Sequence, residues 1–166
     1  MSKFKERLLA LTSLRYEMLP ELLHQMSLAA RGKSNDPILL ILRCHLLTEV
    51  VLERLLDLCL EPNGTAVLSA NLRYIQKLDI ASQCMLVDDF ELIPQSVVAS
   101  LKKLNKLRNR LSHNLNVTIT YKDALELFQG IELPIMDITN KDVPIIIWHY
   151  TSTIFGNMLP NYEAVE

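Results

Sequence analysis

Apolar residues recur every three or four positions through much of the chain, which is the spacing of amphipathic helices. This period predicts a helix from Ser2 to about Ala30, in which Pro20 either begins a second segment or bends the first. A second helix is predicted from Asp36, a favoured N-cap residue followed directly by proline, to about Leu60. The run Pro62-Asn-Gly64 is expected to end it.

The middle of the chain continues the helical period. Asp88 and Asp89 are expected in a short connection for which a helical form is one option. Pro94 then opens a further helix, which is expected to end near His113. Upstream of Asp88, a third helix is predicted from Thr65 to about Leu78. Its apolar residues fall on one stripe, namely Leu68, Leu72, Ile75 and Leu78.

Beyond His113 the pattern is less decisive. Residues 117–120 are expected to form a brief extended stretch, and Thr120 with Asp123 is typical of a helix start that leads into residues 124–128. Pro134 and Pro144 bracket a predicted loop. The uncharged apolar segment 145–158 does not indicate its own type.

The helix predicted from Asp36 carries apolar residues at nearly every angle, so it is expected to be buried on more than one side. A central bundle helix does that, and so does a helix in a dimer interface. The chain has 166 residues, which is enough for one core. Of these residues 49% are hydrophobic and only four are glycine. We therefore expect residues 1–166 to form a single all-α domain, a bundle of four to six helices.

Composition also disfavours several classes of protein. The apolar span 38–60 carries five charged side chains and one histidine, which a bilayer would penalise, so no membrane span is expected. Cys44, Cys59 and Cys84 have neither paired spacing nor a Cys-x-x-Cys, so neither a disulfide framework nor a zinc site is indicated. No metal or other cofactor is expected, and a reducing cytoplasm is the simplest location.

Positive charge is concentrated in one segment, although the formal net charge is −2. Residues 92–122 contain no Asp or Glu, and they contain the six cations Lys102, Lys103, Lys106, Arg108, Arg110 and Lys122. The same segment contains His113. An imidazole can move protons near neutral pH and a guanidinium can hold a phosphate, which are the two tasks of phosphodiester chemistry. A plain solvated basic face is the competing interpretation.

Arg108 falls within the apolar stripe of its helix, between Leu104 and Leu111, so it needs a carboxylate or a cleft. His45, Glu49 and Glu53 form a row one turn apart on the preceding long helix. We expect Glu49 to meet Arg108 and fix its guanidinium. The alternative is that Glu49 and Glu53 pair with the arginines of their own helix, Arg43 and Arg54.

Asn109 and His113 lie one turn apart on a polar face, so the amide is placed to orient the ring. Arg108 and His113 would point well apart in a straight helix. Bringing them together requires a sideways reach of the arginine, a helix that ends near Ser112, or the same motif from a second subunit.

The segment Arg108-Asn-Arg-Leu-Ser-His113 resembles the motif of the HEPN superfamily, in which an Arg, often followed by a polar residue, precedes a His near a helix end. The layout of residues 38–116 is similar to the mannitol operon repressor-like branch. The resemblance implies a HEPN-type helical bundle that acts as a homodimeric, metal-independent endoribonuclease and leaves a 2′,3′-cyclic phosphate. His113, Arg108 and Asn109 would be catalytic, Glu49 would support them, and Arg110, Lys106 and Lys102 would bind the RNA.

A toxin or defence protein with a cognate antitoxin is one role that the resemblance implies. The alternative is a non-catalytic regulatory or scaffold protein, because the mannitol operon repressor-like branch lacks an established nuclease role. A third interpretation is a protein that binds RNA through its basic helix without cutting it. Position 115, where some branches carry a Tyr that is modified, is Leu115 here.

Overall fold

The computed structural model describes residues 3–30, 36–60, 71–87, 90–114, 116–131 and 142–159, and these are predominantly helical. The prediction of an all-α bundle is therefore confirmed. The helices are α1 (Lys3–Ala30), α2 (Pro37–Cys59), α4 (Tyr74–Ala81), α5 (Gln95–His113), α6 (Tyr121–Glu126) and α7 (Val143–Met158), and a short hairpin consists of β1 (Met85–Val87) and β2 (Phe90–Glu91).

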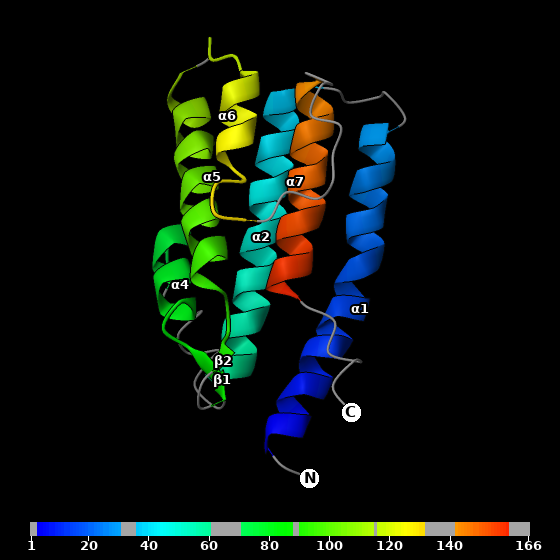
Figure 1. The fold of residues 1–166 in the computed structure, drawn as a ribbon, viewed down its shortest axis with the longest axis vertical. Coiled ribbons are helices and arrows are strands. Elements are labelled where there is room, and N and C mark those ends of the chain that lie inside the picture. Colours follow the sequence, from blue (N-terminus) through cyan, green and yellow to red (C-terminus); the bar gives the residue numbers. More distant parts are fainter. Residues whose placement is uncertain are drawn as a thin grey trace.

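Helix α2 is the centre of the bundle. It begins as predicted, because the Asp36 carboxylate accepts a hydrogen bond from the Ile38 amide at 2.9 Å and Pro37 occupies the first turn. It contacts α1, α4, α5 and α7, and Figure 1 shows it beside α7 in the middle of the molecule. This central position accounts for most of its apolar surface, although Leu46 and Val50 stay 61% and 43% exposed.

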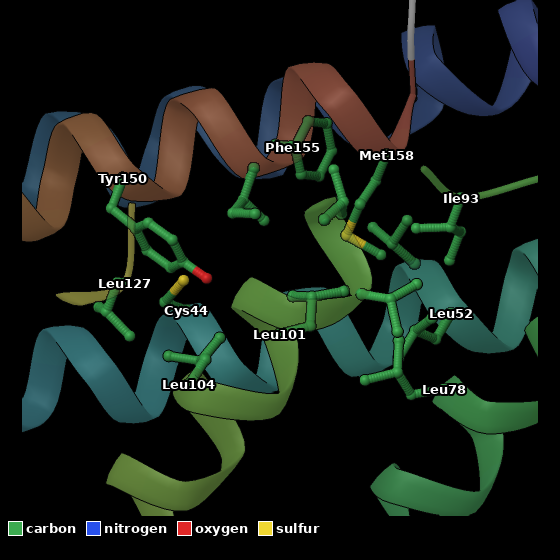
Figure 2. Close-up of a cluster of buried hydrophobic side chains, with 14 of the residues drawn as sticks. Cys44, Leu52, Leu78, Ile93, Leu101, Leu104, Leu127, Tyr150, Phe155 and Met158 are labelled. Carbon is green, nitrogen blue, oxygen red and sulfur yellow. The ribbon is translucent and has the colours of Figure 1, made fainter. Parts of the chain in front are cut away.

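Side chains from α2, α4, α5 and α7 meet in one core, which Figure 2 shows with Leu52, Leu78, Leu101 and Phe155 among its members. Tyr150 is fully buried, so its hydroxyl requires a partner. The Tyr150 hydroxyl oxygen lies 2.8 Å from the Ser100 hydroxyl oxygen. The Ser100 hydroxyl in turn donates to the Leu127 carbonyl at 2.6 Å. This short relay ties α5 and α7 to the segment that follows α6.

The helix predicted from Thr65 to Leu78 is not continuous in its described part. Asn71 has a positive φ of 53°, residues 71–73 are not helical, and α4 runs from Tyr74 to Ala81. Asparagine tolerates this conformation, and the Gln76 side chain accepts a hydrogen bond from the Arg73 amide to start the helix. The prediction is thus wrong for residues 71–73, while residues 61–70, with Pro62-Asn-Gly64, lie outside the described part of the chain.

The connection around Asp88 and Asp89 joins two strands rather than helical residues. Met85 pairs with Glu91 and Val87 with Phe90 in antiparallel register. The Leu92 amide donates to the Cys84 carbonyl at 3.0 Å, and Leu92 itself is buried. The two aspartates lie outside the described residues, but the pairing on either side of them favours a hairpin over the predicted helical option.

The C-terminal part resolves what the pattern left open. Thr120 and Asp123 form a reciprocal capping box that starts α6, as predicted, although α6 ends at Glu126 rather than Phe128. The segment 145–158 is helical, and Pro144 lies in the first turn of α7 instead of closing a loop, because proline lacks only an amide that would be unpaired there. Pro134 lies outside the described residues, and no strand is assigned over residues 117–120.

Helix α1 continues through Pro20 as a single helix, so a second segment does not begin there. No helix in the described ranges has both the length and the apolar character needed to cross a membrane.

Candidate nucleic-acid site

Helix α5 carries the basic segment, and its buried face determines where the polar side chains of the helix point. Leu101, Leu104, Leu107 and Leu111 lie at most 8% exposed against the core. Polar side chains therefore emerge on two sides of this leucine face. Asn105 and Arg108 lie on the side of α2, whereas Lys103 and Arg110 lie on the side of α6.

Arg108 is half-buried, as predicted, but the prediction that it pairs with Glu49 is wrong. Its Nη1 donates to the Asn109 Oδ1 at 3.2 Å, and within the described part of the chain it makes no ion pair. The Glu49 carboxylate instead lies 2.7 Å from the Lys77 ammonium. The alternative pairing of Glu49 and Glu53 with Arg43 and Arg54 is not formed in the described residues either.

Lys77 binds both carboxylates of the α2 row, Glu49 and Glu53, and its side chain is only 9% exposed. Burial opposes its charge, but the hydrogen bonds and charges of the two glutamates outweigh burial and raise the pKa of Lys77. This pair of contacts occurs because α4 packs against α2 with Lys77 towards the row. The only signal in the sequence was a lone lysine between apolar residues of a short helix.

His45, the third member of the α2 row, is buried at 4% exposure. Its Nε2 donates to the Asn105 Oδ1 at 3.1 Å, and its ring lies 4.1 Å from the Tyr74 ring. Burial lowers the pKa of His45, and the charges of Arg108 and Lys77 act in the same direction, against Asn105 and Glu49. The imidazole is thus held neutral, and its contact with α5 was not anticipated from the sequence.

His113 is the last residue of α5 and is exposed, as expected. Arg108 lies five positions earlier in an unbroken helix, so the two side chains leave the axis about 140° apart. Asn109 binds Arg108 and makes no hydrogen bond to the His113 ring among the described contacts. One copy of the chain does not bring Arg108 and His113 together.

The three cations predicted to bind substrate divide into two groups. The Lys102 ammonium lies 2.9 Å from the Asp79 carboxylate of α4. Lys106 and Arg110 line a cavity of about 410 Å³ between α5 and α6, together with Lys103. Arg110 lies 2.8 Å from Asp123 on the opposite wall. Lys102 is therefore separate from this cavity.

The described residues contain no cluster of His, Cys, Asp and Glu that could hold a metal ion. Comparison with the models of known protein families, with curated proteins and with solved structures found no match. The likeness to HEPN proteins therefore rests on the motif residues 108–113 and on the layout of residues 38–116 alone.

Proposed function

We propose that the protein is a HEPN-type, metal-independent endoribonuclease that acts as a homodimer. The observation that carries this proposal is that neither Arg108 nor His113 contacts a carboxylate in the described part of the chain. Their neighbours Lys102 and Arg110 both form ion pairs. An arginine in the last turns of a helix that contacts no carboxylate retains the capacity to bind phosphate.

The chemistry assigned to each residue follows from its functional groups. His113 takes the proton of the ribose 2′-hydroxyl, and the 2′ oxygen attacks phosphorus while the bond to the 5′ oxygen breaks. The 5′ oxygen leaves and takes up a proton from water, a 2′,3′-cyclic phosphate remains, and His113 releases its proton to water. Arg108 binds the phosphate and stabilises the negative charge that develops on it. Asn109 holds the Arg108 guanidinium through the 3.2 Å hydrogen bond.

A second copy is part of the proposal because Arg108 and His113 diverge on one helix. In a symmetric dimer, His113 of one copy works with Arg108 of the other. Leu46 and Val50 of α2 are 61% and 43% exposed and lie one turn apart, beside His45 and Glu49. We assign the partner to this apolar face, which adjoins the α2 side of α5 where Arg108 lies.

The first test is cleavage of labelled single-stranded RNA in the presence of EDTA. General acid–base catalysis contributes about 10²–10⁴-fold, so His113→Ala should lower the rate by that order. Lys102→Ala removes a charge from the same helix that is already paired with Asp79 and lies outside the cavity lining, so it should cut at the wild-type rate. An RNA with 2′-deoxyribose at the cleaved position should stay intact, because the nucleophile is missing.

Mixed dimers test the arrangement across two copies. Arg108→Ala and His113→Ala should each be inactive alone, but a heterodimer of the two keeps one complete site. Statistical mixing should then restore about a quarter of the wild-type activity, since half of the dimers carry one of two sites. No recovery on mixing would contradict the shared site. Absence of cleavage by the wild-type protein would instead favour the non-catalytic scaffold.

A further inference from the structure

The groove between α5 and α6 has a chemical character that the motif does not account for. Its floor is apolar, because Leu107 and Leu127 are 7% and 1% exposed and line the cavity. Its α5 wall carries Lys103, Lys106 and Arg110, which stand at successive turns of one helix face. An apolar floor beneath a row of cations suits a ligand that has both phosphate and nucleoside parts.

The positive charge of this groove is only partly neutralised. Asp123 is committed to Arg110, and it also accepts hydrogen bonds from the Thr120 amide and hydroxyl at 2.8 and 2.7 Å. Burial disfavours the charge of Asp123, but these bonds outweigh burial and lower the pKa of the carboxyl. The α6 wall therefore carries a negative charge at Asp123 that is held in place by hydrogen bonds. Glu126, the other acid of the groove, lies 4.0 Å from Lys122.

Two lysines are left without an opposite charge in contact. The Lys103 ammonium donates to the Gln129 side chain, an uncharged amide. Lys106 is exposed and makes no ion pair among the described residues. Because an uncompensated pair of cations attracts anions, the middle of the groove is its most favourable position for a phosphate.

The groove also leads to His113. Lys106 and His113 are seven positions apart, so in a helix they lie within about 20° of the same direction, with Arg110 between them. The row of cations on the α5 wall therefore points along the helix towards the exposed imidazole. Arg108 leaves the helix on the opposite side, towards His45 of α2.

We propose that the groove between α5 and α6 binds the phosphodiester backbone of single-stranded RNA, in the stretch adjoining the bond at His113. Lys103 and Lys106 contact successive phosphates, and Leu107 and Leu127 support a ribose or base edge. This assignment rests on the proposed function, since it gives the path of the substrate strand. Backbone contacts of this kind carry no base specificity.

Binding is measured apart from cleavage with a fluorescein-labelled 2′-O-methyl RNA oligonucleotide, which cannot supply the attacking hydroxyl. Each phosphate contact on a single strand contributes about −0.7 to the slope of log affinity against log salt. Lys106→Ala should therefore make the slope shallower by about 0.7 and weaken binding about five-fold at 0.1 M salt. Lys103→Ala should behave alike. Lys102→Ala should bind as the wild-type protein does, because the Lys102 ammonium is paired with Asp79 and does not line the groove.

Equal losses in Lys102→Ala and Lys106→Ala would overturn the groove, and so would a Lys106→Ala protein with unchanged slope and affinity. A competition arm with AMP separates a strand from a mononucleotide. Displacement of the probe by AMP at the same concentration as an unlabelled oligonucleotide would also overturn the proposal. If the groove binds the probe as expected but the wild-type protein cuts no RNA, the proposed nuclease is wrong and the binding site stands.

Discussion

The two sides of α5 use polar residues in opposite ways. On the side of α2 and α4, His45 meets Asn105, Tyr74 meets Thr48 at 3.0 Å, and Lys77 meets two glutamates. On the side of α6, Arg110 is the one cation of the α5 wall with an ion-pair partner among the described residues, while the Lys106 charge faces an open cavity of about 410 Å³.

This difference reflects burial. A polar group that loses water must find a partner inside the protein, so the α2 side is a set of matched contacts. A group that keeps water can remain unmatched at little cost, and it stays available for a ligand. We therefore expect substitutions on the α2 side to change stability, and substitutions of the lysines in the groove to change binding.

The largest stability effect is expected from Lys77→Met, which keeps most of the apolar stem and removes the charge. Glu49 and Glu53 would then be left close together without a cation. Because the glutamate side chains are 27% and 43% exposed, we expect the free energy of unfolding to fall by about 3 kcal/mol, the lower end for breaking a buried pair. Chemical denaturation measures the loss.

Two controls sharpen this prediction. Lys102→Met breaks a pair in which both side chains are 49% exposed, and should cost less than about 1 kcal/mol. Neutralising both glutamates in the Lys77→Met background should recover part of the stability. Similar losses for Lys77→Met and Lys102→Met would break the contrast between the two sides.

Asn105→Ala should have the next largest effect. It removes the acceptor of the buried His45 Nε2, and an unsatisfied buried donor costs about 1–3 kcal/mol. Asn109→Ala is the matched control, since this exposed asparagine lies one turn later and its loss should stay within about 0.5 kcal/mol. Thermal unfolding of the two variants compares them directly, and equal melting temperatures would contradict a buried bond at His45.

Thr120→Ala tests the wall of the groove. It removes the side-chain cap of α6 and the hydrogen bond from the Thr120 hydroxyl to the Asp123 carboxylate, and loss of such a cap costs about 1 kcal/mol. Thr118→Ala, exposed and outside the cap, should change the free energy of unfolding by less. If Thr120→Ala also leaves the oligonucleotide affinity unchanged, the fixed α6 wall is not needed for binding.

The smallest effect is a dependence of stability on pH. The pKa of His45 is lowered below 6.5 in the folded protein, so between that lowered pKa and 6.5 the unfolded chain binds more protons. The free energy of unfolding should thus fall as pH drops below 6.5, and level off at the folded pKa. His45→Gln should flatten this slope between pH 7 and 5.5. Arg108→Ala should reduce it, because the Arg108 charge contributes to the lowering.

The parts of the site that could be predicted follow from helical phase. The leucine stripe of α5 indicated that Arg108 would be half-buried and His113 exposed, and both are so. The pairing of Glu49 could not be predicted in the same way. The chain carries 17 lysines and arginines, and a row of acids on α2 indicates only that a cation is needed. Lys77 is that cation because α4 docks there.

The sequence alone determined the elements whose ends depend on neighbours in the chain. The Asp36 cap, the helix after Pro94 and the Thr120–Asp123 capping box are hydrogen bonds or φ preferences within a few residues, so local pattern suffices. The tertiary structure decided that residues 145–158 are a helix, that a hairpin precedes α5, and that His45 contacts Asn105 sixty residues away. Such contacts depend on which faces pack together, and burial against distant residues is not encoded in local spacing.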